Sequence, residues 1–306
     1  MGFVSETHAP GHAAKGASGM GVTAGMGVAD GMTVASGMGI GIGSGTGVAS
    51  AIGTPGHAHD RHIDGCGTLD ATWQAWPGLA ALLPISAAVL VPAHRRAIIV
   101  APHPDDEVLA CGGLLQLLHA QGTHTVLLAV TDGDASHPGS TLLTPADLGR
   151  HRPRETAAAM HALGITPHIL RARIGDGQVL ANLDQLHNLL VQLLQPGDVV
   201  FTTFRQDGHP DHEACGLAAA LAVRACHATL VEMPVWSWHW ATPGDHRLPW
   251  RRARRLQLSD DILQRKQQAV ECFQTQLNDD PSTGQPAILP PHVLQRLLRP
   301  YEIYFI

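Results

Sequence analysis

From Asp70 onward, short runs of apolar residues alternate with longer amphipathic segments. The runs have the length of buried parallel strands, and the amphipathic segments have the spacing of helices that cover such strands. We predict strands at 97–101, 125–131, 167–172, 198–204 and 229–236, and helices at 107–121, 151–163, 183–194 and 213–226. This alternation predicts an α/β fold with a Rossmann-like open sheet, mostly parallel, and helices on both faces. The alternating segment Tyr301–Ile306 is expected to add a strand at the sheet edge.

Residues 1–68 have a different pattern from the rest of the chain. Most of the stretch 16–53 consists of Gly, Ala, Ser, Thr, Val and Met, and Gly-Met recurs at six-residue steps. Such a step is similar to hexapeptide β-helix repeats, but the few copies present cannot bury a core. Glycine-rich backbone also loses much conformational entropy on ordering. We therefore predict a disordered low-complexity tail over 1–68 and one domain over 69–306.

Composition narrows the class of protein. The chain has 306 residues, enough for one large domain, and a formal net charge of -6. It contains no basic run that would follow a nucleic acid backbone. The five cysteines form no CxxC pair and indicate reduced thiols. Since we find neither a secretory signal nor an apolar window long enough for a transmembrane helix, we expect a cytoplasmic protein. The oligomeric state stays open, a homo-oligomer included.

Two polar clusters follow the first and the fourth of the predicted strands. They are P-H-P-D-D-E at 102–107 and D-G-H-P-D-H-E at 207–213. Ligands of open α/β sheets bind just beyond the carboxyl ends of the strands, so both clusters should face one crevice. Catalytic zinc takes three nitrogen or oxygen ligands and one water. His103 and Asp106 can reach one ion across a tight turn, and a histidine of the second cluster completes the set. Asp105 is then free to deprotonate the metal-activated water.

The segments A-P-H-P-D-D-E (101–107) and H-P-D-H (209–212) resemble the two signature motifs of the PIG-L/LmbE-like deacetylases, and the resemblance covers about residues 70–306. It implies a Rossmann-like, zinc-dependent hydrolase that removes an N-acetyl group from N-acetylglucosamine-type amino sugars or glycoconjugates. The resemblance implies His103, Asp106 and His212 as zinc ligands and Asp105 as general base. It also implies a protonated His209 that meets the developing oxyanion or acts as general acid, Asp211 that orients His209, and a substrate contact at Arg152.

Three further segments are candidates for substrate binding. Asp134 follows the second predicted strand, where it either contacts substrate hydroxyls or forms a helix-entry turn. Trp238 belongs to an aromatic cluster over 236–240, which either stacks on a sugar or fills the core. The basic run 250–255 either binds a phosphate or forms a solvated helix face that pairs with nearby aspartates.

Other functions stay open at this point. The same clusters suit a zinc amidase that acts on another small acyl amide, or a non-catalytic metal-binding module of Rossmann-like fold. Asp105 and His209 argue against the module, since a site that only binds metal needs neither. The ligand set also suits Fe²⁺, Co²⁺ or Mn²⁺. A nucleotide-binding Rossmann protein is disfavoured because no G-x-G-x-x-G begins the helix after the first predicted strand.

Overall fold

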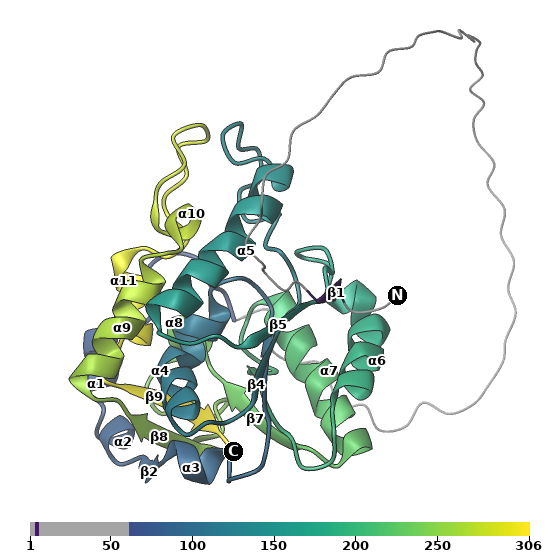
Figure 1. Ribbon diagram of the computed structural model, residues 1–306. Helices are drawn as coiled ribbons and strands as arrows, with labels where there is room; N and C mark the ends of the chain where they lie inside the picture. Colours follow the sequence, from purple (N-terminus) through teal and green to yellow (C-terminus); the bar gives the residue numbers. More distant parts are fainter. Residues whose placement is uncertain (1–3, 6–60) are drawn as a thin grey trace, which may run out of the picture. The chain divides into compact units, whose positions relative to one another are not determined.

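A nine-stranded sheet organises the part of the chain that the structure, a computed structural model, describes, namely residues 4–5 and 61–306 (Figure 1). The strands are β1 (Val4–Ser5), β2 (Leu83–Ile85), β3 (Ala97–Ala101), β4 (Thr125–Ala129), β5 (His168–Arg171), β6 (Val199–Thr203), β7 (Thr229–Met233), β8 (Ala253–Gln257) and β9 (Tyr301–Phe305). Their order is β1-β5-β4-β3-β6-β7-β9-β8-β2. The pairs from β5 to β7 are parallel, as is β2 with β8, whereas β1 with β5 and β9 with both its neighbours are antiparallel. The predicted mostly parallel open sheet is confirmed.

Helices cover both faces of the sheet (Figure 1). On one face α4 (Asp106–Ala120) and α5 (Pro145–Ala162) pack against α9 (Asp260–Val270), and on the other α6 (Leu183–Leu193) packs against α7 (Pro210–Cys226). The shorter elements are α1 (Asp70–Gln74), α2 (Pro77–Ala80), α3 (Ala87–Leu90), α8 (Ser237–Trp240), α10 (Gln274–Leu277), α11 (Pro291–Leu297) and the 3-10 turns η1 (Leu180–Asn182) and η2 (Trp250–Arg252).

The two faces of β3 explain its unbroken apolar sequence. Successive side chains of a strand point to opposite faces of the sheet. Ile98 and Val100 belong to the core beneath α6 and α7, while Ile99 belongs to the core beneath α4. Every residue of β3 is buried. A strand with helices on both sides therefore holds the first polar cluster at a rigid end.

Helix α4 breaks at Cys111, whose φ of -144° is non-helical. A break leaves backbone groups on either side without helical partners. The carboxylate of Glu302, in β9, accepts from the backbone N–H of Gly113 at 2.7 Å and of Leu114 at 2.9 Å. Lys266 Nζ donates to the Leu109 carbonyl at 2.9 Å and to Glu302 Oε1 at 2.7 Å. The buried ion pair thus satisfies both sides of the break.

Strand β9 lies between β7 and β8, so the predicted position at the sheet edge is wrong. Four of its five residues are buried, because helices or neighbouring strands cover it on every side. The strands that extend the sheet beyond β9 are β8 and β2. β8 contains adjacent arginines, and β2 has only three residues with a central proline, so neither has the pattern of a buried strand.

The basic run 250–255 forms η2 and β8, so the expected helix face is wrong. Arg252 Nη2 donates to the buried carboxylate of Glu232 in β7 at 3.0 Å, rather than to Asp260 or Asp261. The aliphatic stems of arginine can cover apolar surface while the guanidinium stays solvated. This property lets an arginine-rich segment serve as a strand.

Helix α5 begins at Pro145, six residues before the predicted start. Thr144 caps it, since the side-chain oxygen accepts from the backbone N–H of Asp147. As a result, Arg152 lies in the middle of the helix rather than in its first turn. None of the helices in residues 61–306 combines the length and the apolar character that a bilayer crossing requires.

Residues 61–68 belong to the predicted tail, yet they contact the domain. Arg61 forms a two-pronged ion pair with Glu213, at 3.1 and 3.2 Å. Arg296 donates to the carbonyls of Cys66 at 3.0 Å and Thr68 at 2.7 Å. Residues 61–68 therefore contact the domain, although the predicted boundary at residue 68 assigns them to the tail. The predicted disorder of the preceding residues concerns positions outside the described ranges, apart from β1, and stays a prediction.

Deletion of residues 1–60 is expected to leave the melting temperature nearly unchanged, whereas deletion of residues 1–68 should lower it by about 5–10 °C. The longer deletion removes the carbonyl partners of the buried Arg296 guanidinium, and a buried charge that loses partners costs about 2–3 kcal/mol. Differential scanning calorimetry of both truncations measures the effect. Equal losses in the two would contradict a structural role for 61–68.

Candidate active site

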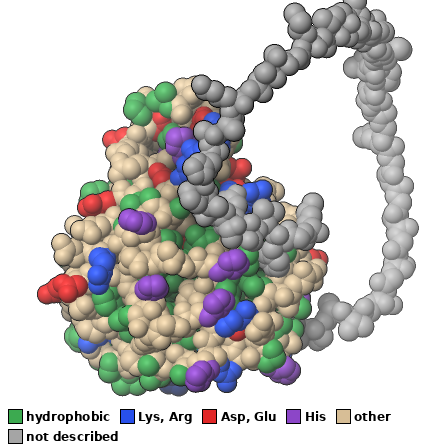
Figure 2. Space-filling model, in the orientation of Figure 1, with side chains coloured by type: hydrophobic (Ala, Val, Ile, Leu, Met, Phe, Trp, Pro, Cys, Tyr) green, Lys and Arg blue, Asp and Glu red, His purple; other side chains and the backbone are tan. Residues whose placement is uncertain are grey.

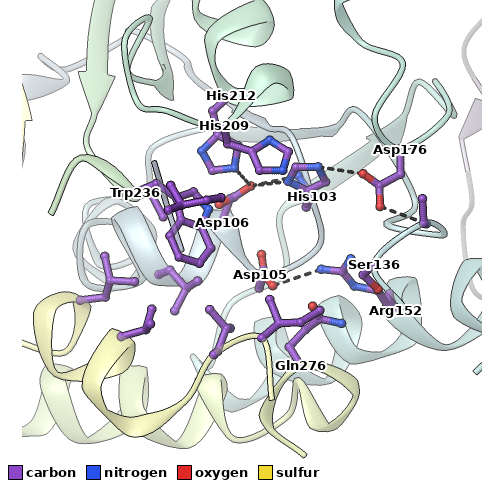
Figure 3. Close-up of a pocket in the computed structure, with 18 of the residues that line it drawn as sticks. His103, Asp105, Asp106, Ser136, Arg152, Asp176, His209, His212, Trp236 and Gln276 are labelled. Atoms are coloured by element: carbon purple, nitrogen blue, oxygen red, sulfur yellow. Dashed lines mark hydrogen bonds and ion pairs between the residues drawn. The ribbon is translucent and has the colours of Figure 1, made fainter. Parts of the chain in front are cut away.

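The two polar clusters meet at the carboxyl ends of β3 and β6, which are neighbours in the sheet. His103, Asp105 and Asp106 lie in the turn between β3 and α4, whereas His209 and His212 lie where α7 begins after β6 (Figure 3). All five line one pocket with a volume of about 640 Å³. This volume lies in the range of small-molecule sites.

The carboxylate of Asp106 lies between two imidazole nitrogens. Its Oδ2 is 3.4 Å from His103 Nδ1 and 3.2 Å from His212 Nε2. Bonds of about 2.0–2.1 Å in a tetrahedral zinc site put neighbouring ligand atoms about 3.3 Å apart. His209 offers a further nitrogen within 4.8 Å of those of His103 and His212. The spacing suits one divalent metal held by His103, Asp106 and His212.

Carboxylates hold the outer nitrogen of both candidate ligand histidines. His212 Nδ1 lies 2.8 Å from Asp207 Oδ2, and His103 Nε2 lies 3.1 Å from Asp176 Oδ1 and 3.2 Å from Asp211 Oδ2. A carboxylate at one ring nitrogen makes that nitrogen the N–H donor and leaves a lone pair on the other for a metal.

The inner nitrogen of His212 provides a test of this assignment. His212 Nε2 is buried and, in the described part of the chain, makes no well-formed hydrogen bond, although Asp106 Oδ2 lies 3.2 Å away. A buried nitrogen lone pair that faces a carboxylate oxygen is costly unless a proton or a cation lies between them. The donor set therefore fits a metal on chemical grounds. His103, Asp176 and Asp211 form a second cluster of donor atoms, but the hydrogen bonds above explain it as the support of His103.

Asp207 is a fully buried carboxylate with many donors around it. Its oxygens accept from the backbone N–H groups of Val235, Trp236 and Ser237 at 2.9 to 3.0 Å and from the Ser237 hydroxyl. These bonds fix its position against His212. They also attach the segment around Trp236 to the metal ligands.

Asp207→Asn is expected to weaken zinc binding about 10–100-fold, the usual cost of losing the partner behind a ligand histidine. The amide preserves shape but no longer favours the N–H on His212 Nδ1. Competition with a zinc chelator measures the affinity. The matched control is Asp134→Asn, because Asp134 does not line the pocket. Equal affinities in both variants would remove Asp207 from the support of the metal site.

Asp105 has an unusual backbone conformation, with φ of 135°. Residues other than glycine seldom occupy this region, and at active sites such strain places a side chain that the chemistry needs. Glu107 Oε2 accepts from the Asp105 N–H at 3.1 Å, and Arg152 Nη2 donates to Asp105 Oδ2 at 3.1 Å and to the Pro104 carbonyl at 2.8 Å. Arg152 thus holds the carboxylate in the pocket, while Glu107 holds the backbone of the same residue.

Burial raises the pKa of Asp105 to about 7, although the Arg152 guanidinium acts in the opposite direction. For Asp106, burial also favours the neutral form, but the adjacent imidazoles of His212 and His103 hold its pKa far below the ordinary value. Neighbouring carboxyls with opposite shifts have different roles. Asp106 stays an anion suited to a metal, and Asp105 suits a group that takes and returns a proton.

His209 is neutral in this environment. Burial, together with the charges of His212 and His103, lowers its pKa to about 3. The backbone N–H of Asp211 donates to His209 Nδ1 at 3.2 Å, so the ring proton resides on Nε2. This environment favours a neutral ring that faces the pocket, and the protonated His209 implied by the family resemblance stays a prediction.

Residues 98–223 match the family model described as "PIG-L: GlcNAc-PI de-N-acetylase". This segment is therefore similar to that family. The match begins in β3 and ends in α7, so it contains both polar clusters and every candidate metal ligand. The resemblance predicted from the two motifs is confirmed over these residues.

The curated relatives of this chain are deacetylases by name. The 1D-myo-inositol 2-acetamido-2-deoxy-alpha-D-glucopyranoside deacetylase of Thermobispora bispora is 32% identical over 146 residues, which are 39% of this chain and 48% of that protein. The enzyme of the same name from Streptomyces avermitilis is 31% identical over 188 residues, 53% of this chain and 62% of that protein. The chain thus spans between about half and three fifths of the length of these relatives.

Among solved structures, the chain is similar to an N,N'-diacetylchitobiose deacetylase from Pyrococcus horikoshii. The identity is 19%, the match covers 61% of this chain and 72% of that chain, and the TM-score is 0.45.

Two of the predicted contacts need correction. The carboxylate of Asp211 supports His103 and accepts from the Gly177 N–H at 2.7 Å, and it is the backbone N–H of Asp211 that contacts His209, at Nδ1. Asp134 lies outside the pocket lining, and its Oδ1 accepts from the Asp176 N–H at 3.3 Å. In both cases loops from neighbouring strands approach the cluster and provide the partner, which the sequence pattern does not reveal.

The third correction concerns the predicted substrate contact of Trp238, which lies in the core. It is 3% exposed, its ring meets Trp73 edge-on with centroids 5.0 Å apart, and it is absent from the pocket lining. The segment forms the single turn α8 instead of an extended strand, which directs Trp238 inward. Trp236 lines the pocket instead (Figure 3). Arg152 also lines it, as predicted, although its hydrogen bonds go to Asp105 and to two carbonyls.

Sequence reasoning missed Asp176 and Asp207 as supports of the ligands. Asp176 follows β5, so the rule that polar residues after parallel strands face the crevice applies to it as well. Asp207 is the first residue of the second cluster, in which roles were predicted only for residues of the H-P-D-H segment. Glycines flank both aspartates, on both sides of Asp176 and after Asp207, and this turn chemistry was the available signal.

Proposed function

We propose that this chain is a metal-dependent N-deacetylase that acts on an N-acetylglucosamine-type amino sugar or glycoconjugate. The observation that carries the proposal is the strained backbone of Asp105, which places its carboxylate beside the ligand set of His103, Asp106 and His212. A protein that only stores metal has no use for this placement. The names of the relatives support the substrate class.

Zn²⁺ is the proposed metal, and the same donors also suit Fe²⁺, Co²⁺ or Mn²⁺. Held by His103, Asp106 and His212, it would supply a Lewis acid that polarises the amide carbonyl and lowers the pKa of a water. Several carboxylates converge on the pocket, among them Asp105, Asp106 and Asp176. A divalent cation offsets their mutual repulsion.

The residues of the chain move the protons and stabilise charge. Asp105 takes a proton from the attacking water and passes it to the nitrogen of the leaving amine, so that acetate and the free amino sugar result. His209 donates its Nε2–H to the oxygen on which negative charge develops, and such a donor contributes about 10²–10³ in rate. Arg152 is a positioning residue, since it holds Asp105 through Oδ2.

The experiment that tests the proposal pairs metal analysis with product release. The purified full chain is loaded with zinc, its metal content is measured by mass spectrometry, and acetate release is assayed on a panel of N-acetylated sugars. About one zinc per chain with acetate release from at least one N-acetylglucosamine derivative is the expected result. A chain that binds no metal after reconstitution overturns the proposal, as does a zinc-loaded chain that releases no acyl group from any amide.

The cytoplasmic location and the small-molecule substrate belong to the same proposal. The five cysteines are all free, as the reducing cytoplasm would keep them.

A further inference from the structure

The pocket has a polar side and an apolar side, and Asp105 and the proposed metal ligands lie between them. Figure 3 shows Trp236 on one side of Asp105 and Asp106, and Ser136, Arg152 and Asp176 on the other. The two sides are relevant because hydrolysis separates an amide substrate into two parts at its C–N bond. One part carries the amine and the other carries the acyl group, and they must extend in different directions from the metal ligands.

The side of Arg152 is suited to a sugar. Asp176 and Ser136 line it, and the Ala135 N–H donates to Asp176 Oδ2 at 3.0 Å. Sugar hydroxyls need hydrogen-bond partners when they leave water, and charged and hydroxyl side chains provide them. The amine-bearing part of the substrate therefore belongs on this side.

The side of Trp236 is apolar. In Figure 3 the side chains drawn beneath Trp236, beside the yellow ribbon of the C-terminal segment, are carbon chains without polar atoms. The apolar residues that line the pocket from this segment, from α4 and from the loop after β7 are Leu109, Val235, Ile288, Leu289, Val293 and Leu297. A sugar hydroxyl placed against this wall would lose its hydrogen bonds, at a cost of about a hundredfold in binding.

This apolar wall continues directly from the reacting centre. Leu109 is one helical turn after Asp105, and its backbone N–H donates to the Asp105 carbonyl at 2.9 Å. Trp236 is tied to the metal ligands through Asp207, which accepts from the Trp236 N–H and hydrogen-bonds His212. An acyl group bound at the metal would therefore meet apolar side chains beyond its first carbons.

We propose that the preferred substrate carries an N-acyl chain longer than acetyl, and that this chain lies along the wall formed by Leu109, Trp236, Leu289 and Val293. The inference rests on the proposed function and names its acyl specificity. An acetyl methyl group is too small to cover this wall, whereas each methylene buried there adds a factor of about four in binding. All of the wall except Leu109 comes from chain beyond residue 223, where the PIG-L match ends.

The test uses the zinc-loaded full chain and glucosamine carrying N-acetyl, N-butyryl, N-hexanoyl or N-octanoyl groups. Every substrate yields glucosamine, so one amine assay measures kcat/KM across the series. The expected result is a rise of at least about tenfold from acetyl to hexanoyl. The octyl glycoside of N-acetylglucosamine is the comparison, because its alkyl chain sits on the sugar instead of the acyl group.

Each outcome decides a different point. A rate that falls with acyl length overturns the inference but leaves the deacetylase standing. A preference for the octyl glycoside, without a gain from acyl length, assigns the wall to the aglycone and also overturns the inference. No glucosamine from any substrate means that the proposed function itself fails.

Val293→Phe fills the wall with a larger side chain. We expect it to lower kcat/KM for N-hexanoylglucosamine at least tenfold relative to N-acetylglucosamine, because the longer chain loses its space. Val191→Phe, on the exposed side of α6, is the matched control. If Val293→Phe fails to fold, Val293→Thr keeps the shape and places a hydroxyl on the wall, which should reduce the hexanoyl preference several-fold. Unchanged preference in a folded Val293 variant contradicts the assignment.

Discussion

Asp105→Asn is expected to retain its metal and to lose turnover by a factor of about 10³ or more. The amide has the shape of the carboxylate, and asparagine tolerates positive φ better than most residues, so the turn should form. What disappears is the group that accepts a proton from water and returns it to the amine. Metal content by mass spectrometry and acetate release measure the two parts of this expectation separately.

The matched control is Asp134→Asn, since Asp134 lies on a nearby loop outside the pocket lining. It should keep at least half of the wild-type rate. Loss of metal together with activity in Asp105→Asn would make Asp105 a ligand rather than the base. Full turnover would mean that another group accepts the proton, and the assignment of Asp105 would have to be given up.

His212→Ala should lose the metal as well as the activity. The substitution removes one of the three proposed ligand atoms, and it leaves Asp106 and Asp207 facing a cavity without the imidazole that joins them. We expect a zinc content below about a tenth of wild type and turnover at the background level, since a two-ligand site does not hold catalytic zinc. Metal analysis after dialysis and acetate release measure this.

His161→Ala, at the exposed end of α5, is the control for loss of a histidine. It should bind zinc and turn over normally. Because His212 is buried, circular dichroism must first establish that the variant folds, and His212→Gln provides a larger side chain if it does not. A folded variant with full zinc content would show that the ligand set lies elsewhere in the cluster.

The sheet and the catalytic cluster were predictable because their signals are local. β3 is a continuous apolar run and β6 begins with one, and each strand is followed by a polar turn that opens a helix. The rule that parallel strands present their carboxyl ends at one edge then brings His103 and His212 together without any coordinates.

The supports of the site were harder to predict because they depend on long-range pairing. Asp207 holds His212 within one cluster, but Asp176 reaches His103 from the loop after β5, and Asp211 does so across 108 residues of sequence. A periodicity argument says which face a residue occupies, not which loop it meets. For the same reason Trp238 and Trp236 could not be separated, since a single helical turn decides which one faces the pocket.

The elements after β7 escaped prediction for a different reason. β8 contains adjacent arginines, and β9 is inserted between strands that precede it in the chain. Neither arrangement follows from hydrophobic pattern alone. This part of the chain also supplies most of the apolar wall, so substrate preference is less visible in the sequence than the chemistry is.

The break in α4 ties the maturation of the active site to the order in which the chain folds. Glu302 satisfies the N–H of Gly113 from 189 residues further along the sequence, and contacts of such separation form late because the intervening chain must first be ordered. A nascent chain that already contains both metal-binding clusters still lacks the partner that stabilises the helix behind Asp105. Metal capture is therefore expected to follow the arrival of β9 rather than to guide it, so that the candidate site is complete only when β9 has joined the sheet.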